Sequence, residues 1–317
     1  MNINKKTSQA TSVLSKSNNN LLLRRMYKYR YFYLMFLPVL ILLIMFNYIP
    51  MIGIRVAFYN WGIMGERTAK FVGLQNFQDL FKSINFWVAF KNTLWISFVN
   101  LILSLIFSVG IALLLNEIRG IRFKKLAQTV LYLPHFLSWV AVASIFIMFL
   151  SPQTGIVNEI IKACGGTPIY FMVSEKWWTP IYLFVNRWKE TGWGTIIFVA
   201  ALAGVDQEMY EAAALDGASR VKQAWYITLP SIQNTILVVF ILNLAKVLNV
   251  FESVLVFYNP MVHNVADVIG TYTYRLGLLS NDYGMSTAVG LFKSVVSLIL
   301  VSIANKASKK IKGEGIL

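Results

Sequence analysis

Charged side chains are scarce in this sequence. Asp, Glu, Lys and Arg make up 14% of the 317 residues, against about 25% in soluble globular domains, and apolar residues reach 57%. A soluble fold of this length has no interior large enough for so much apolar surface. The shortage of charge therefore excludes an ordinary soluble protein and favours a chain that spans a membrane.

Cysteine and histidine are nearly absent as well. A single cysteine, Cys164, excludes an internal disulfide, and the two histidines, His135 and His263, lie far apart and form no metal-binding spacing. Phosphate-binding G-x-x-x-x-G-K-[ST], G-x-S-x-G and H-E-x-x-H sequences do not occur. We therefore expect a non-catalytic chain that binds no metal or cofactor. If such a chain drives uphill transport, the energy must come from a partner or an ion gradient.

Long apolar runs dominate what remains. A helix that crosses the roughly 30 Å bilayer core needs about 20 mainly apolar residues. Backbone polar groups in lipid must be satisfied internally, so these runs predict helices and an all-α membrane fold. Six runs qualify: residues 31–52, 87–115, 127–150, 180–203, 231–258 and 283–305.

Basic residues predict the orientation of the six spans. The chain has 29 Lys and Arg against 14 Asp and Glu. Residues 1–30, 116–126, 204–230 and 306–317 together carry 17 basic residues in 80 positions, whereas the connections on the other side carry 7 in 87. The denser side is cytoplasmic, which places both termini inside. Because the basic residues flank apolar spans instead of forming one stripe, we expect no nucleic-acid partner.

The domain organisation follows from the same runs. Residues 1–30 predict a flexible basic tail that leads into an interfacial segment, residues 31–305 a single six-helix membrane domain, and residues 306–317 a basic cytoplasmic tail. The prolines within the spans, such as Pro38 and Pro134, predict kinks or helix ends.

The cytoplasmic loop 204–230 contains a short helix with clear end signals. Asp206 is a favourable N-cap, and the Ala-rich stretch Gln207–Asp216 follows it. Gly217 suits the left-handed position that ends a helix, and a second helical stretch is expected from Ser219 to Tyr226. Alanines at 212–214 offer a small-residue surface that another protein can approach closely.

The same loop carries a motif at fixed spacing. Glu211-Ala212-Ala213 is followed by three residues, Gly217, nine residues and Ile227-Thr228-Leu229-Pro230. This pattern resembles the EAA loop of binding-protein-dependent ABC importer permeases at every defined position. Ala224-Trp225 is a departure, because the sugar branch often has Phe at the first of the two positions.

The resemblance implies the type I permease fold and a coupling helix that docks on an ATPase subunit. It assigns the ATPase contact to Glu211, Ala212, Ala213, Asp216 and Gly217. Its implied partners are a second homologous permease, two ABC ATPase subunits that use ATP and Mg²⁺, and an extracellular solute-binding protein. It also implies a location in a bacterial cytoplasmic membrane.

Further motifs narrow the substrate class. Tyr48-Ile49-Pro50-Met51 and Gly73-Leu74-x-Asn76-Phe77 resemble carbohydrate permeases of the maltose type. Leu133-Pro134-His135-Phe136-x-Ser138-Trp139 and the stretch from Asp267 to Leu278 resemble the subgroup that imports oligosaccharides cut from complex or acidic polysaccharides. We therefore expect an oligosaccharide importer. The alternatives are an ABC permease for a non-sugar solute and an ion-coupled secondary transporter.

Polar groups inside the predicted spans are candidates for a substrate cavity, because charges in a membrane usually face a bundle interior or a wet cavity. For Lys91, Arg187 and Lys189 we expect side chains that reach the outer interface. For Lys246 and Lys293, pairing with Glu190 or Glu252 is favoured over a lumen that faces an anionic or polyhydroxylated substrate. Residues 243, 246, 247 and 250 would share one helix face. The predicted cavity comprises Trp188, Glu190, Trp193, Asn243, Lys246 and Asn249.

Overall fold

The computed structural model describes residues 27–312, and the chain divides into two units, residues 1–55 and 56–317. In the first unit, α2 (Arg30–Leu43) contains Pro38 and continues through a π-helical turn, Ile44–Tyr48. A 3₁₀ helix, Ile49–Phe58, follows and ends in the second unit. All described side chains up to residue 55 are exposed. An apolar helix that buries none of its side chains is suited to contact lipid. Residues 1–26 and 313–317 of the two predicted tails lie outside the described residues.

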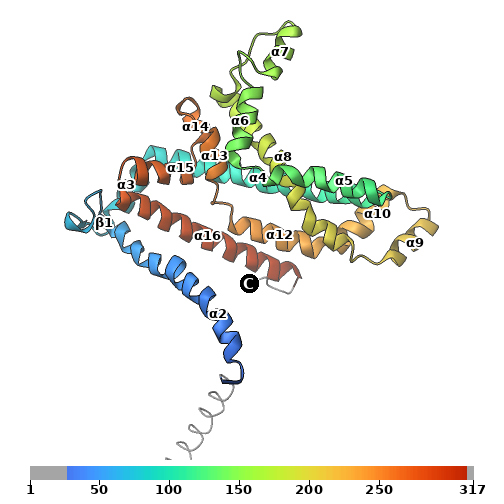
Figure 1. Cartoon of the computed structure of the whole chain (residues 1–317), viewed down its shortest axis with the longest axis horizontal. Coiled ribbons are helices and arrows are strands. Elements are labelled where there is room, and N and C mark those ends of the chain that lie inside the picture. Colours follow the sequence, from blue (N-terminus) through green and yellow to red (C-terminus); the bar gives the residue numbers. More distant parts are fainter. Residues whose placement is uncertain (1–26, 313–317) are drawn as a thin grey trace, which may run out of the picture. The chain divides into compact units, whose positions relative to one another are not determined.

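The second unit begins with a small hairpin, β1 (Tyr59–Asn60) and β2 (Lys70–Phe71), which pair antiparallel with Tyr59 opposite Phe71. A short helix, α3 (Gln75–Lys82), comes next in the chain. The unit also contains three long helices, α4 (Ile84–Glu117), α8 (Glu175–Leu202) and α16 (Tyr283–Lys312). Extensive packing of α4 along α8, and of α12 (Gln233–Ala245) along α16, forms the body of this unit (Figure 1).

Three helical stretches of the described chain are long and apolar enough to cross a membrane, Arg30–Phe58, Ile84–Glu117 and Tyr283–Lys310. Two bent helix pairs raise this number to five if each pair is one span. Helix α8, with 28 residues, is about 42 Å long at ~1.5 Å per residue, but it carries three charges in its middle. The six-span count and the positions of the termini stay predictions.

The predicted span 127–150 is not one straight helix. Two helices, α5 (Ile121–Tyr132) and α6 (Trp139–Phe149), replace it, and the direction of the chain changes by 98° between them. Pro134 has no N–H to continue the ladder of α5, and the Ser138 side chain caps α6 by accepting a hydrogen bond from the N–H of Ala141. That this bent pair crosses the membrane as one span stays a prediction, whereas the end of α5 just before Pro134 confirms the role given to that proline.

The predicted span 231–258 is also interrupted. Helix α12 ends at Ala245, and helical structure resumes only at α13 (Glu252–Phe257). The interruption contains Lys246 and Asn249, whose polar side chains break the apolar run. Irregular backbone at membrane depth is tolerated where it lines a cavity or is covered by protein. The expectation that residues 243, 246, 247 and 250 share one helix face was wrong, because only Asn243 of the four lies in α12.

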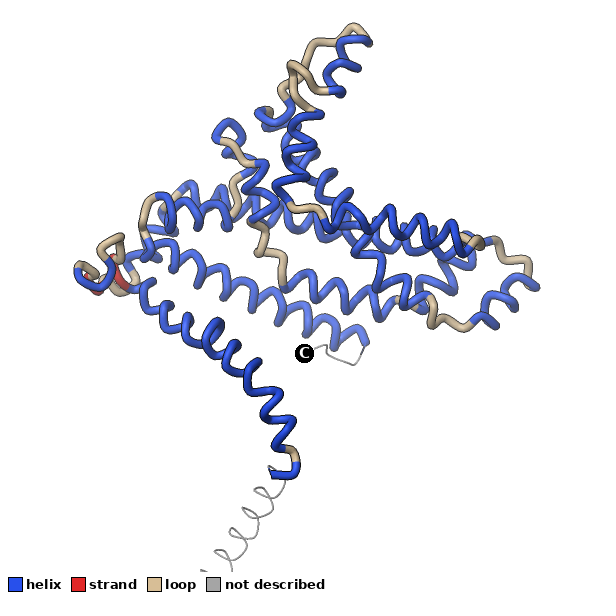
Figure 2. The backbone as a smooth tube through the Cα atoms, viewed as in Figure 1, coloured by secondary structure: helices blue, strands red, loops and turns tan. Residues whose placement is uncertain are grey.

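Short elements occupy the two ends of the unit, and Figure 2 shows loops gathered around α7 (Ile156–Ala163) and α9 (Gln207–Leu215). The remaining short helices are α10 (Arg220–Gln223), α11 (Leu229–Ser231), α14 (His263–Ala266) and α15 (Ile269–Tyr274). Three apolar clusters hold these elements on the long helices. They centre on Trp178 and Phe257, on Phe86 and Ile269, and on Phe198 and Ile232.

Candidate functional site

Helix α9 has the ends that its sequence predicts. The Asp206 carboxylate accepts a hydrogen bond from the N–H of Glu208 at 3.0 Å, which satisfies one of the free donors of the first turn. Gly217 has a φ of +76°, and the N–H of Ala218 donates to the carbonyl of Ala213 at 2.9 Å. A β-carbon on Gly217 would meet no neighbour, so the left-handed backbone alone requires glycine here.

The base of α9 is fixed to the body of the unit. The hydroxyl groups of Tyr210 and buried Thr228 are hydrogen-bonded at 2.9 Å, and the amide of Gln223 donates to the carbonyl of Ala218 at 3.1 Å. Arg220 forms an ion pair with Glu117 at the end of α4, with 3.4 Å between Nη1 and Oε2. These contacts connect α9 and the adjoining α10 to Thr228 and to the end of α4.

No residue in 27–312 covers the outer surface of α9. Glu211, Ala212, Asp216 and Gly217 are exposed, and Ala213 is half-buried. Leu215 is 90% exposed although it is large and apolar. A cavity of about 560 Å³ lies beside the helix, and its lining includes Tyr210, Glu211 and Ala214 of α9 together with Ser219, Arg220 and Gln223. The five residues predicted to contact an ATPase thus lie together on an accessible element.

The predicted cavity residues Glu190 and Trp193 meet in one cluster, on the side of α8 that faces the bend after α5. Glu190 Oε2 lies 2.8 Å from Nδ1 of His135, and the His135 ring stacks on Trp193 with 4.5 Å between centroids and 5° between planes. Lys189 Nζ donates to the carbonyl of His135 at 2.7 Å and lies 3.2 Å from Glu190 Oε1. His135 therefore contacts both Glu190 and Trp193. The sequence did not indicate that His135 lies beside these two residues.

Two predictions about intramembrane charge were wrong. Arg187 and Lys189 are 9% and 4% exposed, so neither side chain reaches outward toward an interface. In the described part of the chain, no ion pair joins Lys246 or Lys293 to Glu190 or Glu252; Glu190 is instead engaged by His135 and Lys189. A residue's partner depends on which helices meet, and spacing along one helix carries no information about that.

Asn243 and Lys246 line a second, polar cavity of about 150 Å³ with Arg187. The other lining residues are Ser97, Asn100, Leu101, Ser104, Val247 and Val250. Residues 243, 246, 247 and 250 therefore do share a surface, although the chain between them is not one helix. Asn249 is exposed and does not line this cavity.

Trp188 lies in a third place. Its ring contacts Phe146 edge-on, with 5.4 Å between centroids, and it borders an apolar groove of about 640 Å³ with Pro134 and Phe184. The six predicted cavity residues are thus divided among a His135 cluster, an Arg187 cavity and two separate positions. The sequence did not identify Arg187 as a cavity residue. The signal available was its position one helical turn before Glu190.

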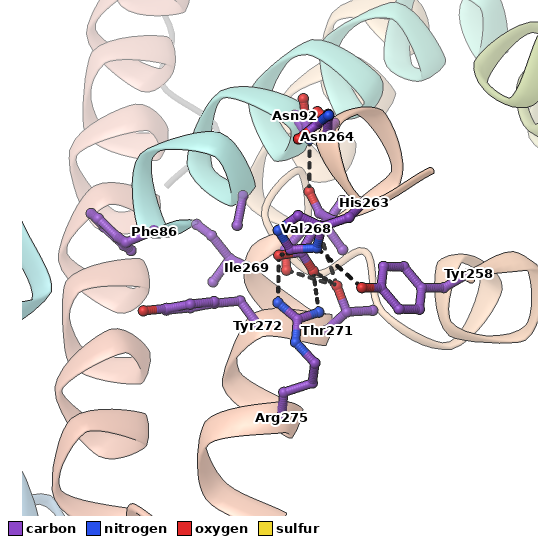
Figure 3. Close-up of polar contacts among 12 residues, drawn as sticks. Phe86, Asn92, Tyr258, His263, Asn264, Val268, Ile269, Thr271, Tyr272 and Arg275 are labelled. Carbon is purple, nitrogen blue, oxygen red and sulfur yellow. Dashed lines mark hydrogen bonds and ion pairs between the residues drawn. The ribbon is translucent and has the colours of Figure 1, made fainter. Parts of the chain in front are cut away.

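A buried charge anchors the predicted external segment 259–282. Asp267 is fully buried, and Arg275 donates to both of its oxygens at 2.6 and 2.7 Å (Figure 3). Thr271 Oγ1 donates to the same carboxylate at 2.7 Å, and His263 Nδ1 lies 3.8 Å away. The hydrogen bond to Asp267 raises the pKa of Arg275, so the guanidinium stays charged.

Helix α4 is bonded to this segment through backbone groups. The Asn92 amide donates to the carbonyls of Asn264 and Asp267 at 2.9 and 3.1 Å, and the N–H of Ile269 donates to Thr93 Oγ1 at 2.7 Å (Figure 3). The motif from Asp267 to Leu278 therefore has a structural role, because it fixes α15 against the N-terminal part of α4. Buried charges persist only when they are paired in this way.

Comparisons with known proteins agree with these observations. A family model described as "binding-protein-dependent transport system inner membrane component" matches residues 104–313. The polygalacturonan/rhamnogalacturonan transport system permease protein YteP of Bacillus subtilis (strain 168) is 42% identical over 309 residues, which is 96% of this chain and 95% of YteP. Protein LplB of the same strain is 42% identical, over 90% of this chain and 91% of LplB.

Solved structures are similar over nearly the same length. A chain of a bacterial ABC transporter involved in the import of the acidic polysaccharide alginate superposes with a TM-score of 0.86 at 38% identity, over 92% of this chain and 99% of that one. A second structure, of the bacterial alginate transporter in complex with an alginate pentasaccharide-bound periplasmic protein, gives a TM-score of 0.85.

Proposed function

Because the chain belongs to the family of binding-protein-dependent transport system inner membrane components, we propose that it forms half of the pore of an ATP-driven importer for acidic oligosaccharides. It is a permease subunit in a cytoplasmic membrane and is not expected to alter its substrate chemically. A second permease would complete the pore, two ATPase subunits would bind ATP and Mg²⁺, and a solute-binding protein would deliver the sugar.

The observation that carries the ATPase assignment is the combination of exposure and rigid anchoring at α9. Glu211 and Asp216 form no ion pair with any residue in 27–312, and Leu215 has no apolar neighbour that covers it. A helix presented in this way and bonded at its base acts as a lever. Closure of the ATPase pair would move α9, and its contacts through Thr228 and Glu117 would pass the movement to the spans.

The substrate class rests on two kinds of support. The relative YteP is named for polygalacturonan and rhamnogalacturonan, and the similar solved structures belong to an importer of the acidic polysaccharide alginate. These polymers share uronate residues that carry carboxylates. The chain itself has two cations, Arg187 and Lys246, at one cavity, which suits an anionic substrate. Family membership leaves the ion-coupled alternative without support.

Co-purification tests the coupling role of α9. Glu211→Lys reverses a charge on the proposed docking surface, and we expect the amount of ATPase retained with this chain to fall about ten-fold or more. Glu159→Lys is the matched control, because Glu159 lies on the distant helix α7 and is also exposed. Equal retention of ATPase by wild type and Glu211→Lys would remove α9 from the proposed interface.

Uptake tests the substrate class. Cells that express the complete importer should accumulate a labelled oligogalacturonate, and deletion of this chain should abolish the accumulation. A neutral maltooligosaccharide of equal length should not compete. Accumulation of the neutral sugar without the acidic one would overturn the proposed substrate and leave the family assignment intact.

A further inference from the structure

Arg187 is a buried cation whose hydrogen-bonding capacity is mostly unused. It lies near the middle of α8 and is 9% exposed. Its Nη2 donates to the side-chain oxygen of Asn186, whereas Nε and Nη1 have no partner among the described residues. Burial of a charged group without partners is costly, and such charges inside a membrane span usually serve the transport path.

Arg187 lies between the apolar groove beside Trp188 and a polar cavity that has no acidic side chain. Ser97, Asn100 and Ser104 of α4 line one side, and Asn243 and Lys246 line the other. Ser97 Oγ and the side-chain oxygen of Asn100 are buried and also lack partners. None of the lining residues is Asp or Glu, so the cavity combines two cations with several uncharged polar groups.

The nearest candidate counter-charge on α8 is already engaged. Glu190 follows Arg187 by three residues, but its two oxygens are held by His135 at 2.8 Å and by Lys189 at 3.2 Å. Lys246, which follows the end of α12 at Ala245 and is exposed, lines the same cavity. Broken helices at membrane depth occur where the backbone lines a transport path.

We propose that Arg187 and Lys246 form an anion site in the translocation path, where the free N–H groups of Arg187 and the ammonium of Lys246 bind a carboxylate of the transported oligosaccharide. This inference rests on the proposed function and deepens it, because it assigns recognition of the acid group to named residues. Ser97, Asn100 and Asn243 would bond to the neighbouring hydroxyl groups of the same sugar unit. Charge-assisted bonds of this kind are about twice as strong as neutral ones.

The site is tested by direct binding of oligosaccharides to the assembled transporter. The solute-binding protein is left out, so its own selectivity does not affect the result. The complete permease and ATPase complex in lipid nanodiscs is titrated with an oligogalacturonate and with its carboxyl-reduced, neutral counterpart. We expect the wild type to favour the acidic chain. Arg187→Gln should weaken binding of the acidic chain about ten-fold or more and leave the neutral one within about two-fold, because charged hydrogen bonds are lost.

Three further variants separate the site from a structural role. Lys246→Gln should weaken acidic binding in the same direction, and Arg187→Lys should restore part of it. Lys293→Gln is the control for loss of a half-buried charge in another predicted span, and should change neither ligand. Equal loss of both ligands in Arg187→Gln would show that Arg187 serves only the structure, and no preference of the wild type for the acidic chain would overturn the site.

A competing explanation is that Arg187 holds the second permease in the complex. Co-purification of that subunit measures this. If Arg187 pairs with a carboxylate of the second permease, then Arg187→Gln will release that subunit during purification while Lys246→Gln will not, and the proposal fails. Failure of the proposed function is distinguishable, because it appears as loss of oligogalacturonate uptake by wild-type cells. Uptake in the wild type with unaltered binding by Arg187→Gln would refute the anion site alone.

Discussion

Arg275→Gln tests the energetic importance of the buried carboxylate of Asp267. The substitution removes two charge-assisted hydrogen bonds, at 2.6 and 2.7 Å, and leaves a fully buried anion with Thr271 as its remaining close donor. Breaking a buried ion pair costs roughly 3–5 kcal/mol. Because 28% of the Arg275 side chain is exposed, we expect a loss of about 2–4 kcal/mol of unfolding free energy.

Reversible unfolding in mixed detergent micelles measures this loss. The double variant Asp267→Asn/Arg275→Gln removes both charges and should be more stable than Arg275→Gln alone, because no uncompensated anion remains. Lys162→Gln is the matched control: it breaks an exposed pair with Glu159 and should change stability by less than about 1 kcal/mol. A loss below about 1 kcal/mol in Arg275→Gln would refute the argument that this pair anchors the external segment.

Three further substitutions probe α9 and the packing of α8. Gly217→Ala forces a β-carbon into the left-handed conformation, should destabilise the helix end by about 1 kcal/mol and should reduce ATPase retention in co-purification, whereas Gly217→Asn should be tolerated better. Leu215→Ser should weaken ATPase binding about ten-fold or more, since burial of leucine contributes roughly 1.5–3 kcal/mol, with no fall in thermal stability. Gly192→Ala would place a methyl group on the carbonyl of Leu131 and should lower the thermal midpoint, whereas Gly290→Ala, which meets open space, should not.

The ends of α9 could be predicted from the sequence because they depend on local rules. A carboxylate at Asp206 finds free N–H groups in the next turn, and Gly217 adopts a backbone conformation that other residues rarely accept. Both effects lie within a few residues, so no knowledge of the tertiary structure is needed. The EAA motif and its family assignment follow from the same short stretch, and the family match confirms that assignment.

The candidate cavity could be predicted only in part. The sequence indicated that Glu190, Trp193, Asn243 and Lys246 are unusual for a membrane span, but it grouped them by their spacing on ideal helices. The chain bends by 98° between Phe136 and Trp139, and α12 ends at Ala245. In the folded chain, His135 lies against Glu190, and Arg187 and Lys246 line one cavity. The spacing of residues within one helix could not predict that His135 lies beside Glu190 or that Arg187 and Lys246 line the same cavity.

The sequence by itself determined that this chain is helical, apolar and a permease of a known family, since composition and local motifs carry that information. Only the tertiary structure decided which intramembrane charges are buried, which are paired and which face a cavity. The physical reason is that the state of a charge depends on the groups within a few ångströms of it. For Arg187 those groups come from α4 and from the chain around Lys246, which are distant in sequence.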